Sequence, residues 1–286
     1  MIITQLAGGL GNQMFQYALG QTLALKNHDT LKLDIRNYTP DNTFRSYKLK
    51  HFAITAAIAT PEEIARIKRD WPVISRFVRA FKIRILRQES VSFKPAILEK
   101  TGDQYLEGYW QSERYFQDSA SVIRRDFTLK EPLGPGAATV AAQIAATAAP
   151  VSLHVRRGDY ASDAKVNAMF GTCSPNYYRR ALKLIRERVP TAHFFVFSDD
   201  LEWVKQQLEL GPDAVFVSNK TTLQDYEELY LMSLCHHHII ANSSFSWWGA
   251  WLDPRPDKIV IAPRVWFHGT NPKMYRDIVP TSWIKL

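Results

Sequence analysis

The fold class is decided by the first eighteen residues, MIITQLAGGLGNQMFQYA (residues 1–18). The apolar run at residues 1–6 predicts a strand, the glycines between residues 8 and 11 predict a tight turn, and apolar residues at helical spacing predict a helix over residues 12–25. An alternating run at residues 31–35 predicts the next strand. Strands that alternate with helices are typical of α/β proteins with parallel sheets.

The second half of the chain repeats this alternation. An alanine-rich segment, residues 137–149, is bracketed by prolines and predicts a helix at the junction between two domains. We therefore expect two Rossmann-like α/β domains, residues 1–149 and 150–286, facing each other across a cleft. The other expected strands cover residues 104–110, 151–155, 193–197, 214–217, 238–241 and 259–262, and the other expected helices cover residues 176–188, 201–208, 226–234 and 246–252.

The composition is that of a globular protein. The chain has 286 residues, of which 46% are hydrophobic and 22% charged, and this excludes disordered, collagen-like and coiled-coil chains. The two cysteines, Cys173 and Cys235, are too few for a disulfide framework and fit a reducing compartment. The sequence shows no leader-like N-terminus and no apolar run of about 18 residues. We therefore expect a cytoplasmic protein.

The net charge of +8 is concentrated in one stretch. Between residues 64 and 87 there are eight basic residues and a single acid, Asp70. One interpretation of this stretch is a surface helix with a solvated basic side. The other is peripheral contact with the inner face of an anionic membrane. Nucleic acid is not expected as a partner, because no nucleic-acid-binding motif is visible. The apolar residues that predict the helix recur at helical spacing: Ile74, Phe77, Val78, Phe81 and Ile85.

The turn between the first strand and the first helix is one of three candidate binding segments. A glycine turn lets a ligand approach the backbone, and the helix N-terminus offers N–H groups, although an ordinary tight turn explains the glycines equally well. Gly9 and Gly11 match two of the three glycines of a dinucleotide fingerprint, and Asp34 stands near the position of a ribose-binding acid. Asn12 and Gln13 add amides that suit hydrogen bonds to sugar hydroxyls.

The second segment is HVRRGDY, residues 154–160, at the carboxyl end of an expected strand. In open α/β sheets, ligands bind at that end of the strands. A guanidinium group is planar and bidentate, and it suits a diphosphate. Because side chains alternate along a strand, Arg156 and Arg157 point to opposite sides, so one can face a phosphate while the other pairs with Asp159 or another acid.

The third segment is NSSFSWWGAW, residues 242–251, after another expected strand. Small hydroxyls at a strand-to-helix turn, together with the N–H groups of the helix start, form a cradle for an anion. The tryptophans favour core packing over stacking on a ligand. Ser198, Asp199 and Asp200 follow the strand at residues 193–197, and they either contact a nucleoside or cap the next helix.

Several other kinds of site are disfavoured. No Asp-x-Asp pair is present to hold a Mg²⁺-diphosphate. The tract His236-His237-His238 lacks the i, i+4 spacing and the nearby glutamate of a zinc helix. The Walker A and Gly-x-Ser-x-Gly patterns are absent. We therefore expect neither a metal nor a cofactor.

The three segments, with YLMS at residues 230–233 before the third, resemble in order and spacing the bacterial α-1,2-fucosyltransferases of glycosyltransferase family 11. The resemblance covers nearly the whole chain. It implies a two-domain GT-B-type fold, with the donor bound by residues 150–286 and the acceptor by residues 1–149. It also implies metal-independent transfer of L-fucose from GDP-fucose to the 2-hydroxyl of a galactose-containing glycan or glycolipid, in lipopolysaccharide or capsule synthesis.

The same resemblance implies roles for single residues. Arg156 and Arg157 would hold the diphosphate, His154 and Asp159 would shape the pocket, and the glycine turn would face the reacting centre. Attack by the acceptor hydroxyl from the face opposite the leaving diphosphate would invert the anomeric configuration. No general base is identified, because the neighbouring arginines weaken Asp159 as a base. The candidate catalytic residues are Arg156, Arg157, Asp159 and Asn12, and the candidate donor-binding residues are His154, Arg156, Arg157, Asp199, Asn242, Ser243, Ser244, Gly9 and Gly11.

Two rival functions fit parts of the sequence. An NAD-dependent Rossmann-type oxidoreductase would use Gly9, Gly11 and Asp34, but the third fingerprint glycine is missing. A non-catalytic carbohydrate-binding protein would use the aromatic residues, but it would not need paired arginines at a strand end. The sequence carries no sign of the oligomeric state.

Overall fold

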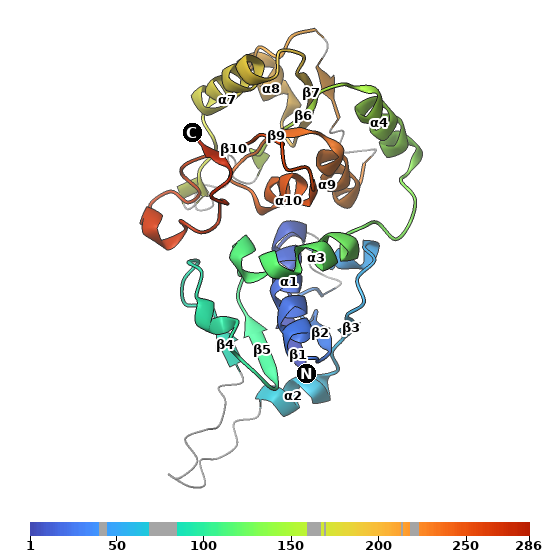
Figure 1. Ribbon diagram of the computed structural model, residues 1–286, viewed down its shortest axis with the longest axis vertical. Helices are drawn as coiled ribbons and strands as arrows, with labels where there is room; N and C mark the ends of the chain where they lie inside the picture. The colour runs from blue at the N-terminus through green and yellow to red at the C-terminus, as the bar shows by residue number, and fades with distance from the viewer. Residues whose placement is uncertain (40–44, 69–84, 159–166, 169, 213, 218–222) are drawn as a thin grey trace. The chain divides into compact units, whose positions relative to one another are not determined.

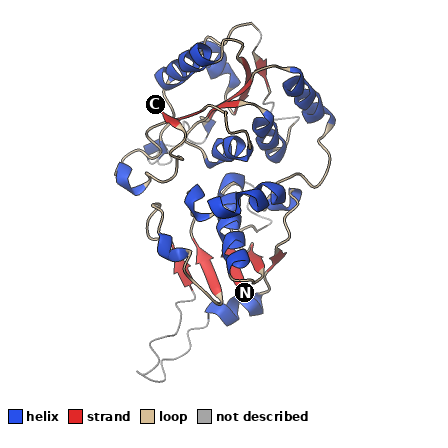
Figure 2. Ribbon diagram, viewed as in Figure 1, coloured by secondary structure: helices blue, strands red, loops and turns tan. Residues whose placement is uncertain are grey.

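The computed structural model describes residues 1–286 except 40–44, 69–84, 159–166, 169, 213 and 218–222. The chain divides into two compact units, Met1–Lys130 (unit 1) and Glu131–Leu286 (unit 2). Each unit contains one parallel β-sheet with helices packed on it (Figures 1 and 2). The expected α/β class with parallel sheets is confirmed in both halves of the chain.

Unit 1 is built on a sheet of five strands in the order β3-β2-β1-β5-β4, and every neighbouring pair is parallel. The strands are β1 (Ile2–Gln5), β2 (Leu31–Asp34), β3 (Ala57–Ile58), β4 (Ile85–Arg87) and β5 (Gln104–Glu107). The helices are α1 (Leu10–Lys26), α2 (Pro61–Lys68) and α3 (Ala120–Asp126), with 3₁₀ turns η1 (Leu49–His51), η2 (Pro95–Ile97), η3 (Glu113–Tyr115) and η4 (Gln117–Ser119).

The N-terminal segment forms the strand, turn and helix that its sequence predicts. Ile2 and Ile3 in β1 are fully buried, and α1 begins directly after the glycine turn. Gly20 lets α1 approach the sheet closely, because a Cβ there would lie 2.3 Å from Thr4 Oγ1. On the sheet, Ile3 and Tyr105 pack with α2 residues in a hydrophobic cluster. Burial of these side chains holds the helix and the strands of unit 1 together.

Unit 2 is built on a sheet of six parallel strands in the order β11-β10-β9-β6-β7-β8. The strands are β6 (Pro150–Val155), β7 (His193–Ser198), β8 (Val215–Phe216), β9 (His237–Ile239), β10 (Val260–Ala262) and β11 (Ile284–Lys285). The helices with described bounds are α4 (Pro135–Ala146), α7 (Pro175–Arg188), α8 (Leu201–Gln207), α9 (Asp225–Leu234) and α10 (Ser244–Leu252), and η5 covers Pro272–Met274.

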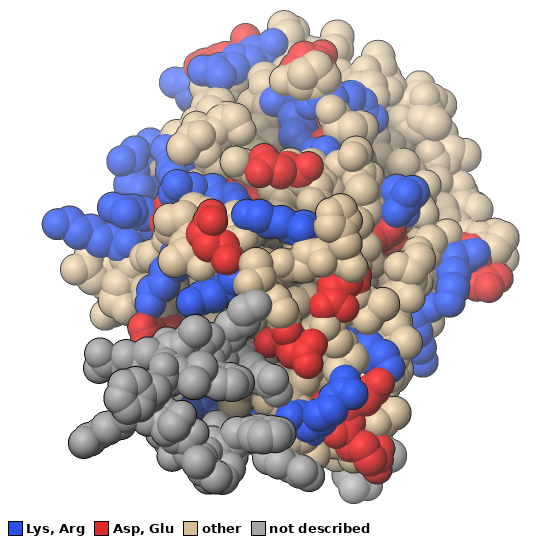
Figure 3. All heavy atoms as spheres, turned by 60° about the horizontal axis from the view of Figure 1, so that its bottom comes forward, with Lys and Arg blue, Asp and Glu red and all other residues tan. Residues whose placement is uncertain are grey.

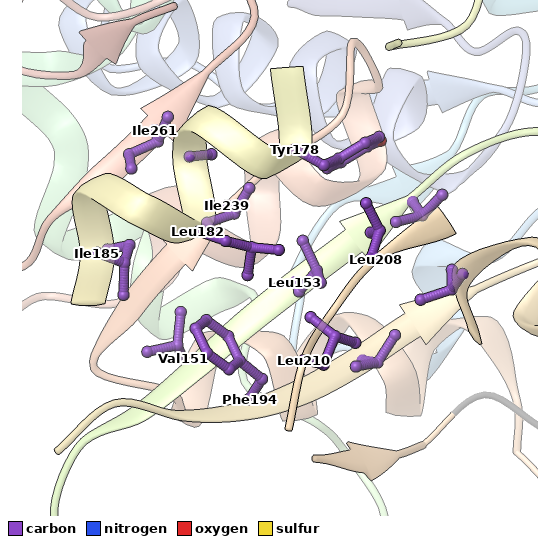
Figure 4. Packing of buried hydrophobic residues seen from close by; sticks show 14 of the residues in the cluster. Val151, Leu153, Tyr178, Leu182, Ile185, Phe194, Leu208, Leu210, Ile239 and Ile261 are labelled. Carbon is purple, nitrogen blue, oxygen red and sulfur yellow. The ribbon is translucent and has the colours of Figure 1, made fainter. Parts of the chain in front are cut away.

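Two hydrophobic clusters cover the faces of this sheet. On one face, Tyr178, Leu182 and Ile185 of α7 pack on Val151 and Leu153 of β6 (Figure 4). The other cluster brings α4 and α9 residues together with Phe195 and Phe197 of β7. The residues of β6 and nearly all residues of β7 are buried, as expected for a parallel sheet between helix layers, although β6 carries the polar residues Ser152 and His154 among its apolar ones.

The division between the units differs from the expected one. We expected the boundary after residue 149, whereas the units meet at Lys130 and Glu131. The alanine-rich helix α4 therefore belongs to unit 2. Its Ala137 and Ile144 are buried in the cluster that contains Phe195, and the Glu227 side chain accepts a hydrogen bond from the N–H group of Gly134 at 2.8 Å. The expectation of a cleft between two domains remains a prediction.

The basic stretch lies mostly outside the described residues, because these omit residues 69–84. We expected Ile85 on a helix face. Instead, Ile85 begins β4, which is the end strand of the sheet and pairs with β5 through Ile85 and Tyr105. Lys68 and Arg87 both form ion pairs with Glu107. Acidic side chains also accompany basic ones over much of the face drawn in Figure 3. Within the described residues, no helix combines the length and apolar composition needed to cross a bilayer.

Candidate functional site

The candidate donor-binding residues of unit 2 follow three neighbouring strands. β6 lies between β9 and β7 in the sheet, and all three are parallel. The carboxyl ends of parallel strands meet at one edge of a sheet, where open α/β proteins bind ligands. This edge receives Arg156 and Arg157 after β6, Asp199 after β7, and Asn242 and Ser243 after β9.

Arg156 is held by the acid that follows the neighbouring strand. Its Nη1 lies 2.8 Å from Asp199 Oδ2, and the other oxygen of Asp199 accepts a hydrogen bond from the N–H group of Arg157 at 2.8 Å. The side chain of Arg156 remains 29% exposed. Gly158 permits this arrangement, since a Cβ there would lie 2.5 Å from Asp199 Oδ2. Asp199 therefore fixes the guanidinium group without burying it.

Arg157 is held by different partners. Its Nε lies 3.1 Å from Asp200 Oδ2, and its guanidinium carbon lies 4.4 Å from the centre of the Trp203 ring. Asp200 also caps α8, because its Oδ1 accepts a hydrogen bond from the N–H group of Trp203 at 3.1 Å. Arg157 is thus fixed on the α8 side of the sheet edge. For the residues after β7 we expected either contact with a nucleoside or capping of the next helix, and Asp200 caps the helix.

His154 is a buried, neutral histidine on the other side. It is 6% exposed, and its ring centre lies 5.8 Å from that of Phe245 in the first turn of α10. Burial, followed by the nearby positive charge of Arg156, lowers the pKa of His154 to about 3. Its Nδ1 is buried and has no hydrogen-bond partner among the described residues. His154 therefore keeps a hydrogen-bonding atom beside the start of α10.

The start of α10 presents N–H groups at the same edge. The Oγ of Ser243 accepts a hydrogen bond from the N–H group of Phe245 at 3.3 Å and caps the helix. The first N–H groups of a helix have no acceptor within it, so Ser244 stands at a position that suits an anion. Trp247 and Trp248 are fully buried, which confirms that they pack in the core.

Asn242 is buried at this edge and forms hydrogen bonds to neighbouring loops. It is 3% exposed, and its Nδ2 donates hydrogen bonds to the carbonyls of Phe170, Gly171 and Trp266 at 2.8, 3.2 and 3.3 Å. Its Oδ1 accepts from the Cys173 thiol at 3.5 Å. Because the whole amide is used inside unit 2, Asn242 holds two loops in place. We expected it to contact the donor, and the sequence gives no signal for these loop contacts.

The glycine turn of unit 1 is stabilised from within. Gln13 is fully buried: its Nε2 donates to the carbonyl of Ser46 at 2.9 Å, and its Oε1 accepts from the N–H group of Lys48 at 2.9 Å. It is therefore not available to sugar hydroxyls. Asn12 is half-buried, and its Oδ1 accepts a hydrogen bond from Gln111 Nε2 at 2.8 Å. Gln111 lies 99 residues away in sequence, so no local pattern predicts this contact.

Gly9 and Gly11 lie at the start of α1, as the sequence predicts. Arg45 is a neighbour that the sequence analysis missed. Its Nη1 lies 3.1 Å from the place where a Cβ of Gly9 would stand. A side chain at Gly9 would need only a small shift of the exposed Arg45 side chain, so this contact alone does not require a glycine there.

Asp34 has partners that leave it no role in binding a ribose. Its two carboxylate oxygens accept hydrogen bonds from Nε and Nη2 of Arg36 at 2.9 and 2.8 Å. The hydroxyl of Tyr105 also donates to it. The side chain is 1% exposed. This arrangement disfavours the dinucleotide interpretation of the N-terminal segment.

The histidine tract does not form a metal site in the described part of the chain, where no group of three or more His, Cys, Asp or Glu residues is placed to hold a metal. His238 is fully buried between two partners. Its Nδ1 lies 2.8 Å from Ser152 Oγ, and its Nε2 lies 3.1 Å from Asp253 Oδ2. His238 therefore has a structural role in the core of unit 2. Asp159, a candidate catalytic residue, lies outside the described residues.

An open hollow of about 500 Å³ lies along α7 and is distinct from this sheet edge. It is lined by Arg179, Leu182, Lys183, Arg186, Glu187 and Glu209. None of these residues belongs to the segments that follow β6, β7 or β9. The hollow therefore contributes nothing to the candidate site.

A sequence model of glycosyl transferase family 11 matches residues 1–286. The chain belongs to glycosyltransferase family 11. The resemblance inferred from the three segments is thereby confirmed. An α-1,2-colitosyltransferase of Escherichia coli is 35% identical, over 100% of this chain and 99% of that protein. The O-antigen biosynthesis glycosyltransferase WbnK of Escherichia coli is 32% identical, over 98% of this chain and 99% of that protein. Human galactoside α-(1,2)-fucosyltransferase 1 is 25% identical, over 86% of this chain and 63% of that protein.

Solved structures agree on the fold of this family 11 glycosyltransferase. The fucosyltransferase NodZ from Bradyrhizobium has a TM-score of 0.50 at 13% identity, covering 88% of this chain and 93% of that one. NodZ α-1,6-fucosyltransferase soaked with GDP-fucose also has a TM-score of 0.50, at 15% identity, covering 91% and 94%. At these identities the likeness concerns the fold alone, an α/β fold with two parallel sheets like that of GT-B enzymes.

Proposed function

We propose that this family 11 glycosyltransferase moves a sugar of the L-fucose type from GDP to the 2-hydroxyl of a galactoside, with inversion and without a metal ion. The names of the relatives support a 1,2-linkage. The observation that carries the proposal is the edge of the unit 2 sheet. There Arg156, the neutral His154 and the start of α10 at Ser244 occupy neighbouring positions.

This edge supplies the charge that the reaction needs. The bond between the sugar C1 and the β-phosphate oxygen breaks, its electron pair stays on GDP, and the acceptor oxygen forms the new bond to C1 from the opposite face. In this proposal Arg156 and the N–H groups at Ser244 stabilise the negative charge that develops on the leaving diphosphate. Arg157, held by Asp200 and Trp203, keeps the segment after β6 in place.

The proton of the attacking hydroxyl needs an acceptor. Asp159 remains our candidate catalytic residue in the segment after β6, and Asn12 remains the candidate that orients the hydroxyl from the glycine turn. A reaction that uses both Asn12 of unit 1 and Arg156 of unit 2 needs the two-domain cleft of GT-B enzymes. This cleft is therefore part of the proposal.

The exact donor sugar is a separate question. The relative that is 35% identical is a colitosyltransferase, and colitose differs from L-fucose only in lacking the 3-hydroxyl. Both sugars present the same leaving group to Arg156, so the phosphate-binding edge serves either. We propose GDP-fucose as the donor and GDP-colitose as the alternative that the experiment must compare.

The experiment incubates the purified chain with each donor and a panel of β-galactosides, and it determines the product linkage by NMR. We expect a 1,2-linked product of inverted configuration, and the same rate when excess EDTA is present. A rate lost in EDTA and restored by Mn²⁺ would contradict metal independence. Thermal stabilisation by NAD but not by GDP, with no transfer to any galactoside, would favour the oxidoreductase and overturn the proposal.

A further inference from the structure

One turn of unit 1 has a strained backbone. Trp110, which follows β5, has a φ of +55° although it is not a glycine, and its side chain is 1% exposed. A large residue in this conformation costs free energy, and it persists only where the surroundings enforce it. Such turns cluster at functional sites.

Two glutamine side chains from different elements enforce the turn. The Oε1 of Gln88, just after β4, accepts hydrogen bonds from the N–H groups of Tyr109 and Trp110 at 2.7 and 3.0 Å. The Nε2 of Gln16 on α1 donates to the carbonyl of Gly108 at 3.0 Å. Residue 108 has no room for a side chain, because a Cβ there would lie 2.4 Å from Gln88 Cβ, and glycine avoids this clash. The strand, its neighbour and the helix therefore all fix the path of residues 108–110.

The residue that emerges from this turn is Gln111, which is 8% exposed. Its Nε2 donates a hydrogen bond to Oδ1 of Asn12 at 2.8 Å. Asn12 is half-buried and lies in the first turn of α1, directly after the glycine turn. An amide whose oxygen accepts an internal hydrogen bond presents its N–H groups to the other side. The hydrogen bond from Gln111 thus fixes the Asn12 amide with its Nδ2 on the side of the glycine turn, 2.6 Å from the place where a Cβ of Gly8 would stand.

We propose that Gln111 is a positioning residue that makes Asn12 offer N–H groups, rather than its carbonyl, to an oxygen of the sugar substrate. This inference rests on the proposed function, and it deepens it by assigning Asn12 a donor role and naming the residues that impose it. An N–H group that points at a hydroxyl oxygen orients the lone pair for attack without taking the proton. Asn12 in this role positions the nucleophile, and the proton leaves to another group.

Three variants separate this role from simple packing. Gln111→Leu removes the hydrogen bond to Asn12 and lets its amide rotate. Gln111→Glu offers only acceptor oxygens, so it draws the N–H groups of Asn12 away from the substrate. Asn12→Asp keeps the hydrogen bond from Gln111 but replaces the outward N–H groups with an oxygen. Gln117→Leu makes the same change at an exposed glutamine of unit 1 and serves as the matched control.

We expect kcat for transfer to fall about 10- to 100-fold in Gln111→Leu, and at least as far in Gln111→Glu and Asn12→Asp. The affinity for GDP, measured by calorimetry, should stay within about twofold, because the nucleotide contacts that we propose lie in unit 2. Combining Gln111→Leu with Asn12→Asp should cost little beyond the single changes, since both act on one interaction. Gln117→Leu should match the wild type.

Two outcomes overturn the inference. If the wild type transfers sugar and Gln111→Leu keeps kcat within about twofold while losing only thermal stability, Gln111 is a packing residue and the positioning role is wrong. If the wild type itself neither binds GDP nor transfers sugar, the proposed function fails, and the inference fails with it. The wild-type measurement therefore distinguishes the two failures.

Discussion

The carboxyl edges of the two sheets use polar side chains in different ways. In unit 1, the amides of Gln13, Gln16 and Gln88 bond to backbone groups of the loops that surround the glycine turn. In unit 2, Arg156 forms an ion pair with Asp199 and remains 29% exposed. A buried amide whose hydrogen bonds are satisfied within the protein fixes a loop. A partly exposed cation still has accessible N–H groups that can bind an anionic ligand. The comparison indicates that amides fix the loops at the edge of the unit 1 sheet, whereas the edge of the unit 2 sheet presents a cation.

The largest effect should come from the cation. We expect Arg156→Ala to lower kcat by about 10²- to 10³-fold, because it removes a group that stabilises the leaving diphosphate. Arg157→Ala should cost roughly tenfold or less, because its guanidinium group is bound to Asp200 and stacked on Trp203. Steady-state kinetics with saturating GDP-sugar measures both variants.

Arg156→Lys is the matched control for this comparison. It keeps the charge but loses the bidentate geometry, so its kcat should lie between those of the wild type and the alanine variant. Equal and mild losses in Arg156→Ala and Arg157→Ala would contradict the division of roles, and the larger loss in Arg157→Ala would reverse it.

The same contrast explains how much the sequence could predict. Most of the longer strands and helices of both sheets follow from apolar periodicity, because burial on a regular backbone leaves a regular pattern. The short strands β3, β4 and β11 and the helices α2 and α3 were not predicted. Arg156, Arg157 and Ser243 were located at the sheet edge by their position after apolar strands. The burial of Trp247 and Trp248 was predicted from their size and their place in a helix.

The rest could not be predicted, because it depends on contacts between distant segments. Gln13 and Asn242 stand in promising positions, but each is used by loops that no local pattern places beside it. The boundary after residue 149 was placed by composition, whereas the apolar side of α4 packs with unit 2. The hydrogen bond of Gln111 to Asn12 spans 99 residues. Such pairings are set by topology, which a single sequence does not reveal.

The second effect tests unit 1 by stability. We expect Gln13→Ala to lower the free energy of unfolding of unit 1 by about 1–3 kcal/mol, because it removes a fully buried side chain that bonds to Lys48 N–H and to the Ser46 carbonyl. Urea unfolding followed by tryptophan fluorescence, together with calorimetric GDP binding, measures the change.

Gln117→Ala is the control for this variant, because Gln117 is exposed in the same unit. Its unfolding should match that of the wild type within about 0.5 kcal/mol. A Gln13→Ala protein of wild-type stability that has lost only catalytic rate would contradict the comparison, since it would make Gln13 a substrate contact.

The smallest effect concerns pH and compares two buried histidines of unit 2. Burial lowers the pKa of His154 to about 3, with Arg156 adding to the effect, and burial lowers the pKa of His238 to about 4 against the opposing bond to Asp253. An unfolded histidine has a pKa of about 6.5. The folded state therefore binds fewer protons than the unfolded state below pH 6.5. The contribution of each neutral histidine to the free energy of unfolding is complete above pH 6.5 and is lost as the pH falls toward its folded pKa, about 4 for His238 and about 3 for His154. Between pH 7 and pH 5 each histidine should cost unit 2 about 2 kcal/mol.

Urea unfolding of the wild type, His154→Gln and His238→Gln at pH 7 and pH 5 tests this expectation. Each variant should lose about 2 kcal/mol of the wild-type difference between the two pH values, whatever its stability at pH 7, because it removes one proton-binding imidazole from the unfolded state. His236 and His237, whose pKa values burial also lowers, remain in both variants and contribute equally to them. Asp253 stays ionised across this range, since its bond to His238 lowers its pKa against the effect of burial. If the wild type were equally stable at both pH values, the histidines would not be buried as neutral groups. The edge of the unit 2 sheet would then hold a second cation at His154 beside Arg156, and the division of charge at that edge would have to be redrawn.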